Sequence, residues 1–409
     1  MDKASFRGLR RSLGEARPVA AADLSVPCDR QRGRLRWREA AGAASVTALV
    51  VPALLGVTPG HGRASSRTDP PGAPVAYVVN VERNTVTPIS TATNKPGQSI
   101  KIAGQPGPIA ITPNGRTAYV PSDAGTVTPI STATNKPGQP IRVGGIPDWL
   151  AFTPNGRTLY VPNISSGTVS VISTATNKVI KTIRTGARPR VVVVAPDGKT
   201  AYVTNQSSST VSVISTAANT VIKTIKVGAG PLNMAITPNG KTVYVADTGL
   251  TVIRTATNTV TKTIPPVRCP SPGGNFSSGM AFTPDSKTAY ILCGFPSVLP
   301  IQTATSKLDA PIAVGESPEA IAITPDGKTA WVADYAPPAV ISIRTATNTT
   351  GKLVNVGDGA IAIAITPNGK TAYEVSYSSG TVTPISTATS RPGRPIRVGK
   401  GAFMIAITP

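Results

Sequence analysis

The segment PDGKTAYVTN (residues 196–205) is one copy of a motif that recurs at a nearly constant spacing along the chain. Each copy places an aromatic residue where this one has Tyr202, and the successive aromatics are 42, 41, 42, 42, 46, 41 and 42 residues apart. The eight aromatics are Tyr77, Tyr119, Tyr160, Tyr202, Tyr244, Tyr290, Trp331 and Tyr373. Repeats of about 40 to 45 residues that contain only short strands are typical of β-propellers, in which each repeat forms one blade.

Each repeat contains four segments with the pattern of a short strand. In one repeat these segments are residues 160–162, 168–172, 179–183 and 191–194. The stretch that follows, residues 196–200, has the composition of a tight hairpin with its Gly at a positive φ angle. We therefore predict an all-β fold, a β-propeller of eight four-stranded blades over residues 75–409, with seven blades as the alternative.

The two ends of the repeat array predict how the ring closes. In a propeller the apolar segment of each repeat is the innermost strand, and the aromatic segment is the second strand. The first aromatic strand, at Val75, has no apolar strand before it, and the last segment, residues 402–409, is an apolar strand with no partner after it. We expect residues 402–409 to pair with the N-terminal blade, because this closes the ring and leaves no exposed inner edge.

Residues 1–74 differ in composition from the repeats. Five arginines between Arg30 and Arg38 precede an uncharged, mainly apolar run at residues 40–57, and small and polar residues follow around Ala64. This order is typical of an export signal. We therefore predict that residues 1–74 are an export signal and disordered leader, and that the protein is secreted or displayed at the cell surface. If the leader is not cleaved, the apolar run would act as a membrane anchor.

The tetrapeptide Tyr-Val-Thr-Asn at residues 202–205, together with the surrounding Pro-Asp-Gly-Lys-Thr-Ala-Tyr-Val and Val-Gly-x-x-Pro motifs, resembles the YVTN-type β-propeller repeat proteins. The resemblance covers residues 75–409. It implies an exported or surface-associated propeller, often without an assigned activity. Members of that family commonly have seven blades, whereas eight repeats are counted here.

The chain is strongly basic. It has 41 Lys and Arg residues against 19 Asp and Glu residues. In the predicted topology, the hairpins between the first and second strands and the turns before the outermost strand lie on one face, which we call the hairpin face. Twelve basic residues lie there: Arg116, Arg157, Lys199, Lys241, Lys287, Lys328, Lys370, Lys95, Lys136, Lys178, Lys307 and Arg391. These charges are explained by solvation of the turns, and the alternative is that this face contacts an anionic surface.

The opposite face, which we call the variable face, carries the connections in which the repeats differ. Each second strand ends there in a small residue: Asn80, Ser122, Asn163, Asn205, Asp247, Cys293, Asp334 or Ser376. Except for Cys293, these residues are polar and are expected to form a polar ring. Such a ring could bind a ligand, or its members could cap the strand ends by bonding to nearby backbone.

One sector of the variable face combines acids with aromatics. Glu319, Asp334 and Glu374 are predicted to lie near Tyr335, Tyr377 and Phe403. Asp148 and Trp149 hold the matching position, at the start of the innermost strand, in another blade. Aromatic rings offer a contact surface for a sugar or peptide, and carboxylates bind hydroxyls, amines or cations. These eight residues are the predicted ligand site, with loop packing as the alternative interpretation.

Histidine and cysteine limit the possible chemistry. The only histidine, His61, is in the leader, so the repeats can contain neither a Ser-His-Asp triad nor a His-ligated metal. No Cys-His spacing indicates zinc or haem, and no cofactor is expected. Cys269 and Cys293 are predicted to share one face of one blade, where an exported protein could join them in a disulfide; two free thiols are the alternative.

The predicted function is therefore non-catalytic: an exported, monomeric propeller that binds or scaffolds a polymer, glycan or protein at the cell envelope through its variable face. A nucleic-acid partner is not expected. The alternative is a lactonase-like or lyase-like enzyme whose divalent cation is held at the axial mouth by Asp247, Asp334, Glu319 or Glu374. A purely structural surface-layer component is a third possibility.

Overall fold

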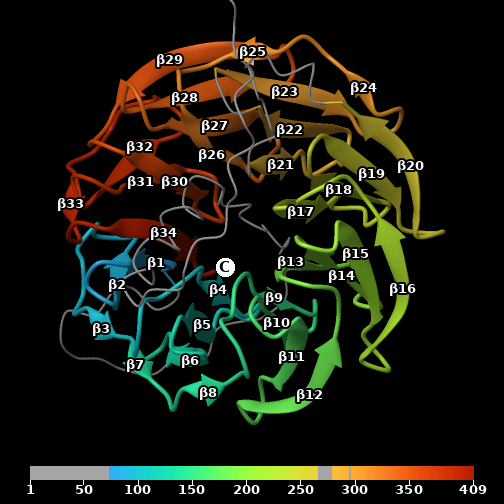
Figure 1. Cartoon of the computed structure of the whole chain (residues 1–409). Coiled ribbons are helices and arrows are strands. Elements are labelled where there is room, and N and C mark those ends of the chain that lie inside the picture. The colour runs from blue at the N-terminus through green and yellow to red at the C-terminus, as the bar shows by residue number, and fades with distance from the viewer. Residues whose placement is uncertain (1–72, 266–278, 294–295) are drawn as a thin grey trace, which may run out of the picture.

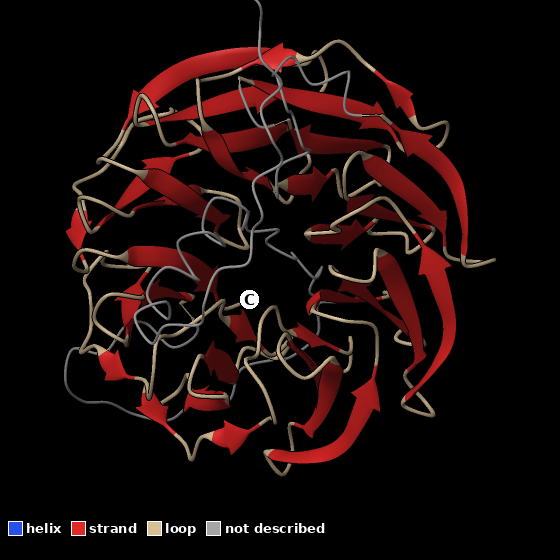
Figure 2. Ribbon diagram, in the orientation of Figure 1, coloured by secondary structure: helices blue, strands red, loops and turns tan. Residues whose placement is uncertain are grey.

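Eight antiparallel sheets surround a central axis in the computed structural model, which describes residues 73–265, 279–293 and 296–409 (Figure 1). Figure 2 shows that these residues form only strands and loops. The prediction of an all-β propeller with eight blades is confirmed. The predicted export signal and leader, residues 1–74, lie almost entirely outside the described residues. Within the described part of the chain, no helix has the length and apolarity needed to cross a bilayer.

We number the blades from 1 to 8 in the order of their second strands. The innermost strands are β34 (Ala402–Ile407), β4 (Ala110–Ile111), β9 (Ala151–Phe152), β13 (Pro189–Val194), β17 (Asn233–Ile236), β21 (Met280–Phe282), β26 (Pro318–Ile323) and β30 (Ala360–Ile365). The second strands are β1 (Val75–Asn80), β5 (Thr117–Ser122), β10 (Thr158–Asn163), β14 (Thr200–Asn205), β18 (Thr242–Ala246), β22 (Thr288–Leu292), β27 (Thr329–Asp334) and β31 (Thr371–Ser376).

The third strands are β2 (Thr85–Ser90), β6 (Thr126–Ser131), β11 (Thr168–Ser173), β15 (Thr210–Ser215), β19 (Leu250–Arg254), β23 (Ser297–Gln302), β28 (Ala339–Arg344) and β32 (Thr381–Ser386). The outermost strands are β3 (Ile100–Lys101), β7 and β8 (Lys136–Pro137 and Ile141–Arg142), β12 (Lys178–Arg184), β16 (Thr220–Lys226), β20 (Thr259–Ile264), β24 and β25 (Lys307–Leu308 and Ile312–Ala313), β29 (Thr349–Asn355) and β33 (Ile396–Arg397).

The outermost strand is continuous in four blades and short or interrupted in the other four. Where it is short or interrupted, the sequence has Pro96, Pro137, Pro311 or Pro392. Proline has no backbone N–H and cannot donate to the neighbouring strand, so it weakens or interrupts the pairing of the outermost strand. Blades 2 and 6 therefore have two short segments in place of one outer strand.

The core lies between the blades. The second strand β14 has one half-buried residue followed by five buried ones, because each blade packs between two neighbours and both faces of its sheet are covered. The eight aromatics of the repeat are at most 1% exposed. Removing a large apolar side chain from water stabilises the fold by roughly 1.5–3 kcal/mol, so this repeated burial holds adjacent blades together.

The ring closes as predicted. The C-terminal strand β34 pairs antiparallel with β1, and the register places Ile405 opposite Val78. Beyond the strand, the N–H of Val75 donates to Oγ1 of Thr408 at 2.8 Å, and the N–H of Thr408 donates to the carbonyl of Val75 at 3.0 Å. Blade 1 therefore takes its innermost strand from one end of the repeat array and its other strands from the other end.

Side-chain hydrogen bonds also join neighbouring blades. At six junctions the hydroxyl of the repeat tyrosine donates to Oδ1 of an asparagine in the turn before the next blade's outermost strand; we call this contact the tyrosine latch. The pairs are Tyr77–Asn135, Tyr119–Asn177, Tyr160–Asn219, Tyr202–Asn258, Tyr290–Asn348 and Tyr373–Asn94, at 2.6 to 2.7 Å. Each asparagine has a φ angle between 51° and 55°, a left-handed conformation that Asn tolerates better than most residues.

The hairpin face is exposed and basic. In the hairpin at Gly198, where φ is 71°, Oδ1 of Asp197 accepts the backbone N–H of Lys199 at 2.9 Å, and Lys199 itself is exposed. All twelve basic residues predicted for this face are exposed. Two of them, Lys287 and Lys328, form exposed ion pairs with the aspartates of their own hairpins at 3.5 and 3.9 Å.

Candidate ligand site at the mouth of the propeller

One position at the start of the innermost strand brings the variable residues of several blades to the same end of the central axis. We call it the mouth position; it lies four residues before the last apolar residue of the strand. Its described members are Gly107, Asp148, Arg190, Leu232, Glu319, Ile361 and Phe403. The residue before it pairs with the end of the second strand, as Pro318 does with Asp334 and Ala402 does with Asn80.

A β-bulge sets the direction of the mouth residues. The register of the inner strand shifts between Pro318 and Ala320, between Ala360 and Ala362, and again beside Phe403. A bulged residue leaves the regular alternation of the strand and re-aims its side chain. The repeats therefore hold a constant frame, while the chemistry of the mouth changes from blade to blade.

Blades 3 and 4 contribute an ion pair to the mouth. Nε of Arg190 donates to Oδ2 of Asp148 at 2.6 Å, with the Asp148 side chain 2% exposed and the Arg190 side chain 14% exposed. A second guanidinium nitrogen donates to Oε1 of Gln206 at 3.4 Å. Burial raises the pKa of Asp148, and the nearby positive charge of Arg190 opposes that rise. Arg190 was not predicted as a site residue, although it follows Pro189 just as Asp148 follows Pro147.

Apolar side chains form another part of the mouth. Phe403 and Ile361 are 5% and 9% exposed and belong to the same hydrophobic cluster. The half-buried Trp149 packs against this cluster and also against a second one that contains Val191 and Met234. Trp149 therefore bridges the apolar surfaces on the two sides of its own blade and offers part of its indole to solvent.

Blade 7 contributes carboxylates. Glu319 is half-buried at the mouth position. Burial and, to a smaller extent, the negative charge of Asp334 raise the pKa of Glu319 to about 7, while a hydrogen bond with Ser317 acts to lower the pKa. Asp334 is fully buried at the end of β27, and its Oδ1 accepts the N–H groups of Ser317 and Ala336, each at 3.0 Å. Burial raises the pKa of Asp334, while these N–H groups stabilise its charged form.

The other predicted sector residues lie at different depths. Tyr335 is 40% exposed, and one edge of its ring lies against Gly359, where an added Cβ would sit 3.2 Å from Cε2. Tyr377 is half-buried, and its hydroxyl donates to Oε1 of Glu82 at 3.3 Å.

Glu374 lies within β31 and is fully buried. Burial raises the pKa of Glu374 to about 8, and Oγ of Ser376 donates to its Oε1 at 2.6 Å. The fold thus places Glu374 inside its blade and not on the surface of the mouth.

The described members of the predicted polar ring are buried. Their exposed fractions are between 0% and 4%: Asn80, Ser122, Asn163, Asn205, Asp247, Asp334 and Ser376. Several bind the backbone that leads in from the preceding blade. Nδ2 of Asn80 donates to the Gly399 carbonyl at 2.8 Å, and Oδ2 of Asp247 accepts the Gly228 N–H at 2.8 Å. These side chains hold the loops of the variable face in place.

Cys293 ends the segment after β22, where the other repeats have a polar residue. It is fully buried and disulfide-bonded. Cys269, its predicted partner, lies outside the described residues.

The described residues therefore form a β-propeller that carries both apolar and charged side chains at one end of its axis. Residues 131–297 match the family described as "Lactonase, 7-bladed beta-propeller", which is less than half of this eight-bladed chain. No match was found among proteins of curated function.

Solved structures share the architecture. The dihydro-heme d1 dehydrogenase NirN in complex with DHE is 15% identical with a TM-score of 0.71, covering 84% of this chain and 77% of that one. AztD from Citrobacter koseri is 14% identical with a TM-score of 0.66, covering 82% and 98%. Kuenenia stuttgartiensis hydrazine synthase is 24% identical with a TM-score of 0.55, covering 69% and 96%. At these identities the likeness shows the fold alone.

Proposed function

We propose that this protein is a non-catalytic propeller that binds a ligand at the cell envelope through the mouth on its variable face. The observation that carries this proposal is the mouth position itself. Where the rest of the repeat is nearly constant, this position supplies Phe403, Ile361, the Asp148–Arg190 pair and Glu319. In repeat proteins, the positions at which the units differ are the ones used for binding.

The chemistry of the mouth favours a ligand with an apolar face and polar groups. The half-buried indole of Trp149 suits stacking against a sugar ring or an apolar side chain of a peptide. Glu319, with a pKa of about 7, would accept a hydrogen bond from a hydroxyl or pair with an amine. The carboxylates of Asp148 and Asp334 are already bonded to Arg190 and to backbone N–H groups, which supports a positioning role for them.

Tryptophan fluorescence of the full chain, titrated with N-acetylglucosamine oligomers and with peptide fragments of cell-wall origin, tests the proposal. A ligand that reaches the mouth is expected to change the emission of Trp149. Trp149→Ala and Glu319→Gln, each measured by calorimetry, are expected to weaken binding by about tenfold or more. Leu353→Ala, on the exposed outer strand of blade 7, is the matched control and is expected to leave affinity unchanged. If both mouth variants bound the ligand as tightly as the unaltered chain, the proposal would be contradicted.

A lactonase-like hydrolase is the second candidate. It is favoured by the family match over residues 131–297, which include Asp148, Arg190 and Asp247. Among the described residues, no three His, Cys, Asp or Glu side chains lie close enough together to hold a metal ion jointly. The discriminating assay follows opening of a δ-lactone by the full chain, with and without added magnesium, calcium or manganese. Turnover that is lost in Glu319→Gln or Asp334→Ala but kept in Leu353→Ala would replace the binding proposal.

A further inference from the structure

A pair of facing residues at the outer rim of the variable face distinguishes five blades from the other three. In these five blades the first residue of the third strand is Thr, and its partner in the sheet is the basic last residue of the outermost strand. The pairs are Thr381–Arg397, Thr85–Lys101, Thr126–Arg142, Thr168–Arg184 and Thr210–Lys226. All five basic residues are exposed, and among the described residues none of them forms an ion pair.

These five blades are consecutive. They are blades 8, 1, 2, 3 and 4, because β30 of blade 8 and β34 of blade 1 lie side by side where the ring closes. Blades 6 and 7 have Ala313 and Asn355 at the same place, opposite Ser297 and Ala339. In blade 5 the outermost strand ends at Ile264, which matches Ile225 of blade 4, and the residue at the place of Lys226 is Pro265. We call the five cations, Arg397, Lys101, Arg142, Arg184 and Lys226, the basic arc. Solvation alone would serve equally well in blades 5 to 7, so it does not explain why the cations stop at blade 4.

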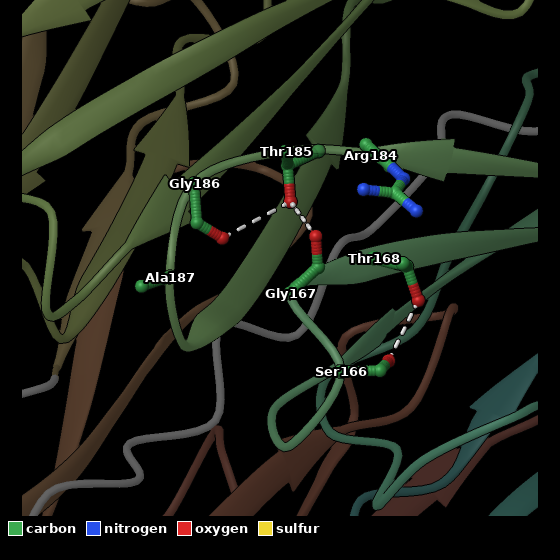
Figure 3. Close-up of a pocket in the computed structure, with 7 residues that line it drawn as sticks. All are labelled: Ser166, Gly167, Thr168, Arg184, Thr185, Gly186 and Ala187. Carbon is green, nitrogen blue, oxygen red and sulfur yellow. Dashed lines mark hydrogen bonds between the residues drawn. The ribbon is translucent and has the colours of Figure 1, made fainter.

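A hollow adjoins the arc in blade 3 (Figure 3). It has a volume of about 350 Å³. It is lined by residues 166–167 and the first residue of β11, Thr168, by Arg184 at the end of β12, and by residues 185–187, which lead to blade 4. Its polar groups are hydroxyls and backbone: Oγ of Ser166 lies 2.8 Å from Oγ1 of Thr168, and Oγ1 of Thr185 donates to the Gly167 carbonyl at 3.3 Å. The lining contains a cation and no carboxylate.

Blade 2 has an equivalent hollow of about 390 Å³ beside Arg142. Asp123 also lines it, and Oδ1 of that residue accepts the N–H of Gln105 at 2.7 Å. The carboxylate is thus tied to the loop of its own face, whereas the guanidinium of Arg142 is exposed. Two neighbouring blades therefore repeat one arrangement: a hollow lined mainly by small residues of the variable-face connections, together with an arginine of the outermost strand.

We propose that the basic arc binds an anionic polysaccharide along the rim of blades 8 and 1 to 4, with the hollows at Arg184 and Arg142 as its anchoring subsites. Cations placed one per blade on an arc can be engaged together only by an extended polyanion. The hydroxyls and backbone groups of the hollows offer hydrogen bonds to sugar hydroxyls. No aromatic ring lines either hollow, and this disfavours nucleic acid, whose bases bind single-strand sites by stacking. The arc is separate from the mouth and requires no ligand there.

Surface plasmon resonance of the full chain over immobilised polygalacturonate tests the proposal. Arg142→Gln combined with Arg184→Gln is expected to weaken binding by about tenfold, because two exposed charge contacts are lost. The remaining affinity should depend less steeply on salt. Lys328→Gln combined with Lys370→Gln removes the same charge from the hairpin face and is the matched control, expected to stay within about twofold of the unaltered chain.

Three results would overturn the proposal. They are an equal loss in the arc and hairpin-face variants, which would indicate a net-charge effect; equal binding to neutral dextran; and equal or tighter binding to single-stranded poly-dT. Unchanged circular dichroism and thermal midpoint of the arc variant, whose altered side chains are exposed, would assign a loss of binding to the site itself.

Discussion

The hydroxyl of Tyr373, in the last blade, donates a hydrogen bond to Oδ1 of Asn94, in the first blade, at 2.6 Å. This tyrosine latch spans the closure of the ring beside the β34–β1 pairing, and the same contact recurs at five other junctions. At the remaining two, the turn residue at the equivalent position is Ser306 or Ser390. The repeat motif therefore specifies two things at once, the buried aromatic between blades and the polar contact that joins it to the next blade.

Removing the latch hydroxyl at the closure is expected to destabilise the fold by about 1 kcal/mol, the usual net value of a hydrogen bond. The change is Tyr373→Phe, which keeps the buried ring. Urea unfolding followed by circular dichroism gives the free energy of unfolding. The control is Tyr335→Phe, whose ring is 40% exposed and which is expected to stay within about 0.5 kcal/mol of the unaltered chain. Equal effects in the two variants would contradict a role for the latch.

The asparagine of the latch has a second role that can be measured separately. Asn94 has a φ angle of 55°, which Gly adopts freely and Ala does not. Asn94→Gly should therefore lose only the latch, by about 1 kcal/mol, while Asn94→Ala should lose about 1 kcal/mol more through backbone strain. If Asn94→Ala were no less stable than Asn94→Gly in the same unfolding assay, the left-handed conformation at this position would cause no backbone strain in alanine.

Deleting residues 402–409 is expected to destabilise the whole ring and not only blade 1. The deletion removes β34, leaves β1 without its inner partner and exposes apolar residues such as Val78, which is fully buried in the intact ring. Repeat arrays unfold readily when an end is left uncapped, and open inner edges associate. A thermal midpoint more than about 10 °C lower, together with aggregation in size-exclusion chromatography, is the expected result. A truncated chain that stays monomeric with an unchanged midpoint would contradict it.

The fold could be predicted from the sequence because its signals are local and repeated. The nearly constant spacing of the eight aromatics from Tyr77 to Tyr373, with a hairpin after each apolar segment, predicted eight blades. The unpaired apolar segment at residues 402–409 predicted the observed closure of the ring. The latch was not predicted, because the turn that holds Asn94 is far in sequence from Tyr373 and the contact exists only when the ring is closed.

The candidate sites could be predicted only in part. Acids and aromatics of the variable face were found by composition, but burial separates them: Glu374 lies inside its sheet and Tyr335 faces solvent. Arg190 was missed because its importance rests on a contact with Asp148 in the preceding blade. The basic arc could not be predicted, because it is defined by how the outermost strands pair with the third strands, and a count of charged residues does not give that pairing register. One sequence signal could have indicated Arg190: it directly follows Pro189 of the innermost strand, as Asp148 follows Pro147.

Removing one partner of the ion pair at the mouth is expected to lower the free energy of unfolding more than replacing both partners by apolar residues. Asp148→Ala leaves Arg190, only 14% exposed at its side chain, without its carboxylate partner, and should destabilise the fold by roughly 3 kcal/mol. Replacing both residues by Leu removes the uncompensated charge and should cost less than the single change. Chemical unfolding of both variants measures the difference. A double variant that is less stable than Asp148→Ala would show that the pair contributes more than charge compensation.

The buried carboxyl of Glu374 is expected to make stability fall as pH rises. Its pKa in the folded chain is about 8, against an ordinary value of 4.5, so between these values the unfolded chain releases a proton that the folded chain retains. The folded state is therefore favoured fully below about pH 4.5, and the advantage is lost as pH rises towards 8, by at most about 1.4 kcal/mol per pH unit. Glu319, Asp334 and Asp148 act in the same direction, since burial raises the pKa of each.

The difference between the unaltered chain and Glu374→Gln isolates this one group. The amide is neutral at every pH, and its oxygen can still accept the hydroxyl of Ser376, so the variant should show a flatter pH dependence of the free energy of unfolding between pH 5 and 8. At pH 8 we expect the variant to be more stable by about 2 kcal/mol or more. Glu82→Gln, which neutralises an exposed carboxylate, is the control and should keep the original slope. Parallel pH profiles for Glu374→Gln and the unaltered chain would mean that Glu374 stays ionised inside its blade, stabilised by groups other than Ser376.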